Sequence, residues 1–410
     1  MSSSTMSNQD LLDVDDARAR ILALAAPVSV ERVGLIDLDP RPRVLASTIL
    51  SKRALPPFTN SAMDGYGVRA GTQAGTQLRI VGQSLAGHGS SISIGAGEAI
   101  AITTGAPIPA GVDAVVMREL CDESRAKDGV VVVNHAPGAG EHVRLRGEDV
   151  SEGAVVGAAG DVVTPARLNL LLSAGHVSAE VFRRPVVAVL ASGDELSEIG
   201  EGIGDGVIVN SNAWAIAAAA RAAGADVRML GIAKDTLEDH VRMIDVDDAD
   251  VVVTIGGVSV GSHDFVRPAL LQLGATLHLW KIAMRPGKPL AFGSLVRRRR
   301  PVLVLGLPGN PVSALVTFTL FGLPLLRALA GRREVLPVVS RAILVDDRPF
   351  VKKKGLRFFA RARLEEGSVR LLERQGSGQV SGLADANALA CLDKDAERIE
   401  PGAVLEVIPL

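Results

Sequence analysis

Hydrophobic residues recur with two different periodicities along this chain, and the periodicity distinguishes one segment from another. Between residues 184 and 330, short runs of Val, Ile and Leu alternate with segments whose apolar residues recur at helical spacing. The runs predict buried strands and the spaced segments predict helices, so this region indicates a mostly parallel sheet covered on both faces. The expected strands are 186–190, 226–232, 251–255, 277–282 and 302–305, and the expected helices are 213–223, 237–244, 265–273 and 311–330.

The remaining segments predict a multidomain α/β and β protein. Helices are expected at 14–25, at 44–51 and after Thr164-Pro165, whereas residues 78–163 and 338–410 contain short β-branched runs cut by Gly, Pro and Asp. The helix after Thr164 is expected to pack against the N-terminal helical segment, which would make the β-rich segment between them an insertion. We expect an N-terminal or linker domain (11–55 plus 150–183), a β-rich inserted domain (56–149), an α/β domain (184–331) and a small C-terminal β-barrel or sandwich (337–410).

The amino-acid composition limits the possible binding partners of the protein and the cellular compartment in which it is expected. The net charge is −2 with no basic or acidic half, which argues against nucleic acid and against an anionic membrane as partners. The two cysteines are far apart and the first 16 residues lack a signal-peptide pattern, so a cytoplasmic protein is expected. The uncharged run 301–326 is long enough to cross a bilayer, but Pro308-Gly309-Asn310-Pro311 interrupts it, which predicts a buried strand, a turn and a buried helix.

Three glycine-rich loops follow expected strands of the α/β domain. They are Ser192-Gly193-Asp194-Glu195, Gly256 through Gly261, and Gly306 through Pro311. Glycines allow the backbone to approach a ligand closely, and its N–H groups can then point at phosphate oxygens. In the last loop Asn310 suits an N-cap and Pro311 a first helical residue, although a well-formed helix start would explain that loop by itself.

Cations and acids lie beside these loops. Lys281, Arg285 and Lys288 occur within eight residues in a proline-rich stretch without acids, which favours an anion pocket over a surface hairpin. Asp64, Asp264 and Glu195 each lie in a loop beside glycines. Carboxylates near a phosphate favour a divalent cation between them, and Mg²⁺ is the default. The residues alone thus predict a pocket for a phosphorylated anion, assisted by a metal.

Seven short motifs that occur in a fixed order point to one protein family, and the resemblance extends from about residue 12 to the C-terminus. They are Asn60 through Tyr66, Thr103 through Pro107, Gly147-Glu148-Asp149, Gly193 through Leu196, Gly256 through Gly261, Arg285 through Pro289 and Leu307 through Pro311. Together they closely resemble the molybdopterin molybdotransferases, the family that includes the E domain of gephyrin. The α/β domain would then be a molybdopterin-binding domain.

The resemblance implies an elongated homodimeric enzyme of four-domain subunits, in which the active cleft includes residues from the partner's β-rich domain. It also implies transient contacts with other proteins of molybdenum-cofactor biosynthesis. It implies two substrates, molybdate and adenylylated molybdopterin, Mg²⁺-assisted hydrolysis of the pyrophosphate bond, and release of AMP and molybdenum cofactor. It assigns catalysis to Asp64, Glu195, Asp264, Lys281 and Lys288, and metal binding to Asp264, Glu195 and Asp64. It assigns substrate binding to Thr104, Asp149, Asp235, Gly256, Gly257, Ser259, Gly261, Arg285, Pro308, Gly309 and Asn310.

One position departs from the family pattern, and two rival functions stay open. Where many relatives have lysine directly before the Pro-Gly-Lys-Pro motif, this chain has Arg285, whose planar fork replaces a compact ammonium. A molybdopterin adenylyltransferase would share the α/β domain but lack the long N-terminal half. A non-catalytic scaffold of the gephyrin type would be free to lose its motif acids, all of which are present here.

Overall fold

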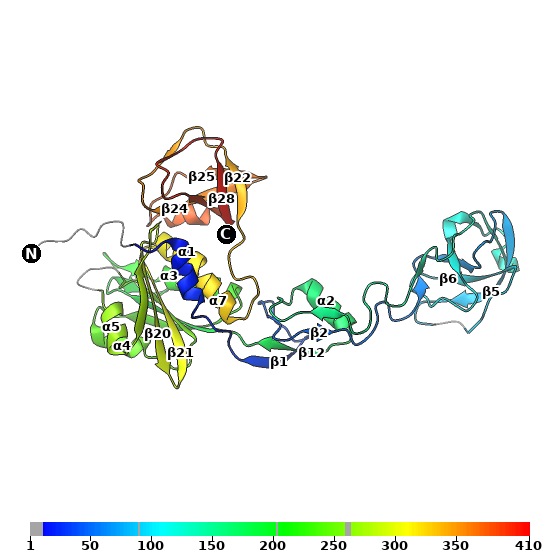
Figure 1. Ribbon diagram of the computed structural model, residues 1–410, viewed down its shortest axis with the longest axis horizontal. Coiled ribbons are helices and arrows are strands. Elements are labelled where there is room, and N and C mark those ends of the chain that lie inside the picture. Colours follow the sequence, from blue (N-terminus) through cyan, green and yellow to red (C-terminus); the bar gives the residue numbers. More distant parts are fainter. Residues whose placement is uncertain (1–10, 89–90, 202–203, 259–263) are drawn as a thin grey trace, which may run out of the picture.

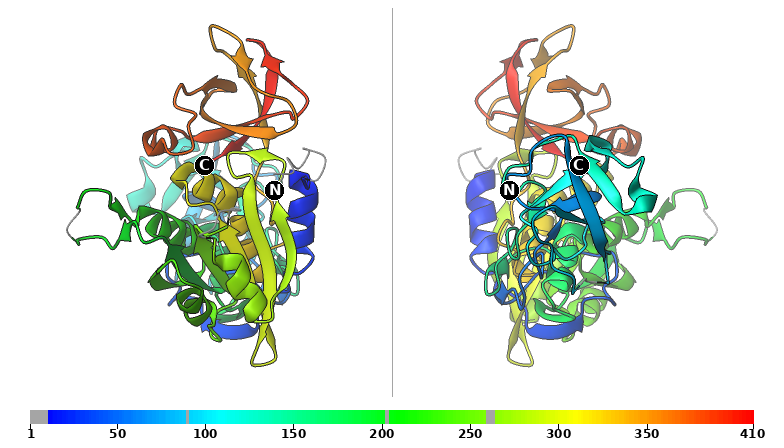
Figure 2. Two further views of the ribbon diagram at one scale, coloured as in Figure 1. Left: turned by 90° about the vertical axis from the view of Figure 1, so that its left-hand side faces the viewer. Right: turned by 90° about the vertical axis from the view of Figure 1, so that its right-hand side faces the viewer.

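The computed structural model describes residues 11–88, 91–201, 204–258 and 264–410. The molecule is elongated (Figure 1). One end holds an α/β domain with a small β domain beside it, the middle is a narrow linking region, and the far end is a separate β-rich domain. Figure 2 views the same arrangement along the long axis.

The α/β domain contains a six-stranded, mostly parallel sheet in the order β16-β13-β17-β21-β20-β18. The first four strands are parallel, and β20 is antiparallel to both of its neighbours, so β18 runs in the same direction as β21. The predicted parallel sheet is therefore confirmed, except that β20 was not expected. The strands are β13 (Val186–Ser192), β16 (Asp226–Ala233), β17 (Val251–Ile255), β18 (Thr276–Lys281), β20 (Pro289–Arg297) and β21 (Arg300–Leu307).

Helices cover both faces of this sheet, as the pattern predicts. Helices α4 and α5 pack on one face, and α1, α3, α6 and α7 pack on the other. The apolar run from Pro311 to Leu329 is long and apolar enough to cross a membrane, but most of it is buried against the sheet, as a core helix would be. The helices are α1 (Val14–Leu22), α3 (Ser211–Ala222), α4 (Leu237–Ile244), α5 (Val266–Gln272), α6 (Pro311–Thr317), a π-helical turn (Phe318–Gly322) and α7 (Leu323–Leu329).

The N-terminal helix belongs to the α/β core. Val14, Ala17 and Ile21 of α1 are fully buried there, against the helix that ends in α7. Helix α2 (Pro165–Ser173) packs instead on the linking region, so the expected contact between α1 and α2 is wrong. The predicted start of α2 is confirmed, because the Thr164 side chain accepts a hydrogen bond from the Arg167 amide and Pro165 is the first helical residue.

The linking region consists of paired segments that are distant in sequence. Strand β1 (Val30–Gly34) pairs with β12 (Ser178–Phe182), and β2 (Ile49–Leu50) pairs with β11 (Val155–Gly157). The helix expected at 44–51 is wrong. The Leu45 amide donates to the Asp161 carbonyl instead, so pairing with a distant segment prevails over local apolar spacing.

The two segments of chain that enter and leave the β-rich domain pair with each other. Leu55 bridges to Val150, and β3 (Asn60–Ser61) pairs with β10 (Val143–Arg144). Beyond this neck lies a six-stranded sheet in the order β7-β4-β6-β5-β9-β8. Its strands are β4 (Gly65–Val68), β5 (Thr76–Ser84), β6 (Glu98–Ile102), β7 (Ala114–Met117), β8 (Cys121–Asp122) and β9 (Val130–Val133).

The C-terminal domain is a small closed barrel. Strands β24-β25-β22-β28-β26 pair in that order, and β26 pairs back with β24 to close the ring. Strand β19 (Met284–Arg285) pairs with β24 and joins the barrel to the α/β domain. The barrel strands are β22 (Ser340–Leu344), β24 (Arg357–Glu365), β25 (Ser368–Leu371), β26 (Ala388–Leu392) and β28 (Val404–Pro409), with helix α8 (Val380–Ala384) and the pair β23 (Phe350–Val351) and β27 (Arg398–Ile399).

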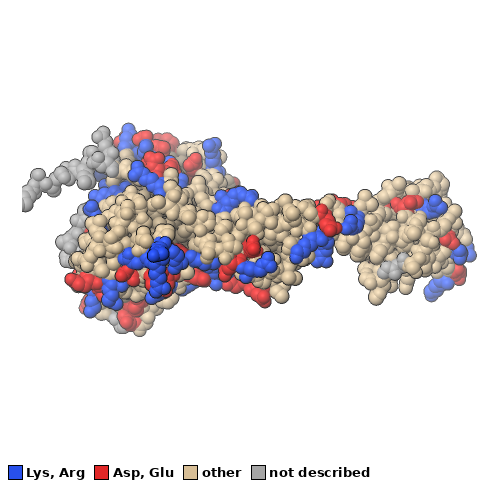
Figure 3. Space-filling view, turned by 60° about the horizontal axis from the view of Figure 1, so that its bottom comes forward, with Lys and Arg blue, Asp and Glu red and all other residues tan. Residues whose placement is uncertain are grey.

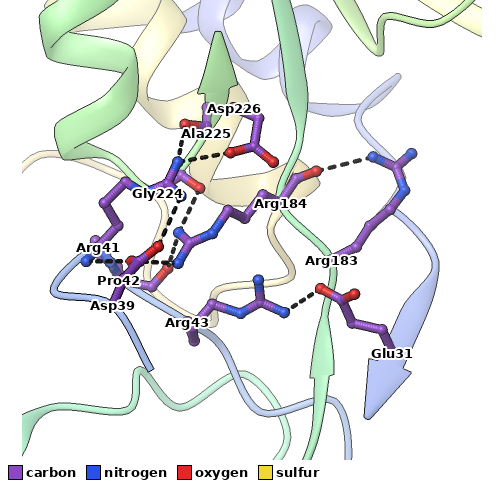
Figure 4. A network of polar contacts seen from close by, with 10 residues as sticks. All are labelled: Glu31, Asp39, Arg41, Pro42, Arg43, Arg183, Arg184, Gly224, Ala225 and Asp226. Carbon is purple, nitrogen blue, oxygen red and sulfur yellow. Dashed lines mark hydrogen bonds and ion pairs between the residues drawn. The ribbon is translucent and has the colours of Figure 1, made fainter. Parts of the chain in front are cut away.

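Arginines fasten the linking region to the α/β domain (Figure 4). The Arg184 guanidinium donates to Asp39 at 2.7 Å and to the Gly224 carbonyl at 3.1 Å, and Arg41 donates to Asp226 at 2.7 Å. These groups fix where the linking region leaves the amino-terminal edge of the sheet. They thereby set the direction in which the β-rich domain extends.

A neighbouring ion pair provides a stability prediction. Asp250 accepts two hydrogen bonds from Arg183, at 2.6 and 2.7 Å, and one from the Val186 amide at 2.8 Å. We expect Asp250→Ala to lower the free energy of unfolding by about 2–3 kcal/mol, since it leaves a half-buried cation and an amide without their acceptor. Denaturant titration measures this change.

The matched control is Asp248→Ala. Asp248 accepts two bonds of 2.6 Å from Arg228, but both side chains are more than half exposed. Solvent screens such a pair, so the expected loss is less than about 1 kcal/mol. Equal losses at Asp250 and Asp248 would contradict the prediction.

Candidate functional site

The loops that the sequence singles out meet at the carboxyl-terminal edge of the α/β sheet. Ala191 of β13 is in register with Ile255 of β17, and Ile255 with Leu307 of β21, so the turns after these strands are adjacent. The Gly256 amide donates to the Leu307 carbonyl at 3.0 Å and ties two of the turns together. This edge is where ligands bind in open α/β sheets.

The turn after β17 requires glycine. Gly256 has φ +92° and Gly257 has φ +65°. A Cβ on Gly256 would lie 2.7 Å from the Ser192 carbonyl oxygen, and one on Gly309 would lie 3.6 Å from the Gly256 Cα. Backbone from three strands therefore comes together at one place, as a site that presents N–H groups to a phosphate requires. Pro308 is buried beneath this place, and Gly309 is exposed at it.

Three of the predicted acids lie along the same edge. Glu195 is exposed in the turn after β13, and the preceding Asp194 accepts a hydrogen bond from the Asp235 amide at 3.1 Å, which brings in the loop after β16. Asp264 is half-buried just before α5. Within the described ranges, no three His, Cys, Asp or Glu side chains form a group that could hold a metal ion.

The cation cluster lies at the other side of this edge. Lys281 ends β18, which points the same way as β21, and the Ile282 amide donates to the Lys288 carbonyl at 3.0 Å to close the loop between them. Lys288 and Arg285 are exposed. The Arg285 guanidinium lies 5.4 Å from the centre of the Phe358 ring of the C-terminal barrel. A flat guanidinium suits that stacking, which gives the departure from lysine a structural reason.

The first turn of α6, which follows β21, confirms one part of the prediction for this loop and not the other. Pro311 is the first helical residue, as expected, but the Asn310 side chain makes no capping hydrogen bond. The neighbouring Gly309 carbonyl accepts a hydrogen bond from the Asn212 side chain at 2.8 Å, so α3 also reaches this turn. Asn310 is exposed at the site edge, where a side chain without a capping role can serve a ligand.

The C-terminal barrel also reaches the site, which the sequence reasoning missed. The Val312 amide, in the first turn of α6, donates to the Ser377 carbonyl at 3.1 Å. In the same barrel Arg361 is 1% exposed, and its Nε donates to the Arg374 carbonyl at 2.8 Å. The glycine-rich run 375–379 was a signal for such a loop. By itself this run indicates only a turn within the expected barrel.

Asp64 and Thr104 form a second group at the far end of the molecule. The Asp64 carboxylate accepts a hydrogen bond from the Thr104 amide at 2.6 Å, beside a cavity of about 250 Å³ that Tyr66, Arg118 and Glu123 also line. Hydrogen bonds from Thr104, with a smaller contribution from Arg118, hold the pKa of Asp64 below its usual value. Asp64 is therefore a carboxylate at neutral pH.

The neighbouring tyrosine is held in its neutral form. Tyr66 donates to Glu123 at 2.8 Å, and Arg118 donates to the other oxygen of Glu123 at 2.9 Å. Burial, followed by the bond to Glu123, raises the pKa of Tyr66 to about 12. Glu123 thus holds the Arg118 side chain beside the Asp64 cavity.

The structure does not bring all predicted residues together within one chain. Asp64 and Thr104 belong to the β-rich domain, which Figure 1 places at the opposite end from the α/β sheet. Asp149 lies between the two groups, near the neck, where its amide donates to the Leu55 carbonyl at 3.1 Å. Ser259 and Gly261 lie outside the described residues.

On the face that Figure 3 shows, charged side chains do not single out either end of the molecule. Figure 3 shows one face of the molecule, on which Lys and Arg are interspersed with Asp and Glu along its length. A polyanion such as nucleic acid would favour a continuous basic stripe instead.

Fold and site together define a class: multidomain proteins whose α/β domain presents glycine-rich turns and cations, suited to a phosphorylated anion, at its carboxyl edge. Three family models match the chain. They are the MoeA N-terminal region (domain I and II) at residues 12–175, a probable molybdopterin binding domain at 188–328, and the MoeA C-terminal region (domain IV) at 344–410.

Curated relatives agree over nearly the whole length. A molybdopterin molybdenumtransferase of Haemophilus influenzae is 34% identical, with 97% of this chain and 98% of the relative covered. One of Nostoc sp. is 34% identical, with 90% and 86% covered. A molybdopterin biosynthesis MoeA protein of Pyrococcus horikoshii has a solved structure with a TM-score of 0.82 and 25% identity, covering 98% of this chain and all of that one. The chain belongs to the molybdopterin molybdenumtransferase family, and the resemblance inferred from the motifs is confirmed.

Proposed function

We propose that this protein inserts molybdate into adenylylated molybdopterin, hydrolyses the pyrophosphate bond and releases AMP and molybdenum cofactor. The observation that carries the proposal is the position of Lys281, Arg285 and Lys288 at the same sheet edge as the turns at Gly256 and Gly309. Cations beside closely approaching backbone suit a substrate that combines phosphate groups with an oxyanion. Full-length membership of the family supports the choice of that substrate.

The roles follow from charge and position. The glycine turns hold the phosphate groups through backbone contacts, and the three cations neutralise phosphate and molybdate. Glu195 and Asp264 would hold Mg²⁺, which commonly takes one or two carboxylates and completes its shell with substrate phosphates and water. This fits an edge where described acids are present but form no group of three. When bound, the metal would neutralise charge that develops on the pyrophosphate.

The site as proposed needs two subunits. Asp64 is ionised, yet it lies at the far end of its own chain from Glu195 and Asp264. We therefore place Asp64 and Thr104 of one protomer at the α/β edge of its partner in a homodimer. Transient contact with proteins that deliver the intermediate and receive the product would occur in the cytoplasm.

The direct test is a reconstitution. Purified protein receives adenylylated molybdopterin, Mg²⁺ and molybdate, and AMP is followed with time. Release of AMP that depends on molybdate is the expected result. Consumption of ATP without need of molybdate would identify an adenylyltransferase instead. No turnover with any of these substrates would favour a scaffold and overturn the proposal.

A pH prediction follows from the contact between Thr104 and Asp64. The Thr104 side chain contributes to the lowered pKa of Asp64, so Thr104→Val should raise this pKa towards its usual value while the backbone bond stays. A depressed pKa keeps the carboxylate charged into the acid range, and raising it makes the charge disappear at higher pH. The acidic limb of the pH profile of kcat/KM should therefore move to higher pH. Thr72→Val is the control, since that hydroxyl bonds to Arg69 in an exposed loop of the same domain. An unmoved acid limb would contradict the prediction.

A further inference from the structure

A buried histidine and serine lie directly beneath the glycine turn of the site. His240 is 0% exposed, and its Nε2 is 2.8 Å from the Ser192 hydroxyl oxygen. Its Nδ1 is 2.8 Å from the Thr236 carbonyl oxygen. Ser192 is the last residue of β13, and His240 lies in α4, so this pair joins the sheet to a covering helix.

The hydrogen-bond network assigns the protons. A carbonyl oxygen only accepts, so Nδ1 of His240 carries the hydrogen and donates to Thr236. With the ring hydrogen on Nδ1, Nε2 is the acceptor, and the Ser192 hydroxyl donates to it. Each polar atom of the two side chains thus has a partner in a buried place. Removing either partner would leave the other without its hydrogen bond.

Parts of the substrate site rest on this pair. A Cβ on Gly257 would lie 3.3 Å from the Ser192 Oγ, 3.7 Å from the His240 Nε2 and 3.0 Å from a Val266 methyl. The His240 ring also packs against Phe265, with 5.7 Å between ring centres, and Phe265 directly follows Asp264. One buried imidazole therefore supports both the turn at Gly256–Gly257 and the residue next to Asp264.

We propose that Ser192 and His240 are positioning residues that hold the Gly256–Gly257 turn in the shape that binds the phosphate groups of the substrate. This rests on the proposed function. Serine beside histidine also resembles a nucleophile with its base. That role does not fit, because Ser192 is 8% exposed and Gly257 covers its hydroxyl, leaving no approach for a phosphorus atom.

The first test compares Ser192→Ala with Ser192→Thr. A phosphate-binding turn acts on the ground state and the transition state alike, so its loss raises KM and leaves kcat nearly unchanged. For Ser192→Ala we expect a KM for adenylylated molybdopterin raised about tenfold, with kcat within about twofold of wild type. Ser192→Thr keeps the hydroxyl and should restore KM. An unchanged KM in Ser192→Ala, or no recovery in Ser192→Thr, would overturn the proposal.

A second comparison separates positioning from stability. His240→Leu alone leaves the Ser192 hydroxyl without its acceptor and should lower Tm. The double variant Ser192→Ala/His240→Leu removes both polar partners, which restores much of the stability because no buried polar atom stays unpaired. The double variant should still show the raised KM. Recovery of KM together with Tm would mean that the pair serves folding only, and the proposal would be wrong.

Failure of the proposed function can be told apart from failure of this inference. Wild-type protein without AMP release refutes the function, whatever the variants do. Amide hydrogen exchange on unliganded protein reports on the turn itself. In Ser192→Ala, the peptide spanning residues 251–258 should exchange faster than in wild type, whereas in Ser192→Thr it should not. Equal exchange in all three proteins would contradict the positioning role.

Discussion

Alanine at Asp264 or at Asp64 is expected to lower the rate of AMP release roughly 100-fold or more while the protein stays folded. The two acids come from opposite ends of the chain, yet the proposed mechanism gives both a part in one reaction. Asp264 lies beside the glycine turn of the α/β edge, where a carboxylate can hold a metal against the pyrophosphate. Asp64 is kept ionised by Thr104 at the surface of the β-rich domain.

Exposed acids of the same charge provide controls in the same domains. Asp128 in the β-rich domain is exposed, with only an ion pair of 3.9 Å to Arg125. Asp205, between α3 and the turn at Glu195, is exposed as well. Alanine at either should leave AMP release unchanged. Wild-type turnover in Asp64→Ala or Asp264→Ala, with thermal unfolding intact, would refute the site assignment.

The sequence predicted the α/β domain closely because its signals are local. Strand β17 and helix α4 have the bounds that the pattern predicts, and α1 begins at the predicted Val14. In these segments burial on both faces of a strand, or on one face of a helix, determines which residue types occur. The strands expected near 342–345, 356–362, 369–373 and 404–408 are likewise present in the barrel, since alternation along each strand reflects its own buried face.

The errors occur where distant segments decide the structure. Residues 44–51 have helical spacing, but Val44 bridges to Val162 and Leu45 to Val181, and no local pattern reveals those partners. Strand β20 was missed because its pairing with β18 and β21 depends on the loop at Lys288 turning the chain back. The position of α1 likewise depends on the α/β core, far along the sequence.

In the candidate site too, features with a local sequence signal could be predicted, whereas features that depend on distant segments could not. Glycines, cations and acids could be selected by type and by their position after strands, because those positions meet at one edge of a parallel sheet. The residue pattern by itself could not show that Asp64 and Glu195 lie in domains at opposite ends of the chain, and only the family resemblance implied it, through a cleft that includes the partner's β-rich domain. Nor could the pattern show that the barrel residue Ser377 contacts the first turn of α6. It also gave no hint of His240, which on a helix face has the pattern of an ordinary core residue.

Mixing the two inactive variants is expected to restore activity to about a quarter of the wild-type level, if two protomers share each site. In a mixed dimer of Asp64→Ala and Asp264→Ala, one site combines an intact α/β edge with an intact Asp64 from the partner, and the other site carries both defects. Random exchange of subunits makes about half of the dimers mixed, and each has one working site of two.

The result of the mixing experiment depends on whether Asp64 can reach Asp264 within the same chain. Both groups of residues belong to domains that Figure 1 places at opposite ends of the molecule, and the arginine contacts at Asp39 and Asp226 fasten the linking region to the α/β domain. A single chain so arranged cannot bring Asp64 to its own Asp264. Coexpressed variants carrying different affinity tags allow the mixed dimer to be isolated, and its rate should be about half that of wild type. An inactive mixed dimer would mean that the acids act in one chain or not at all, and the shared site would have to be abandoned.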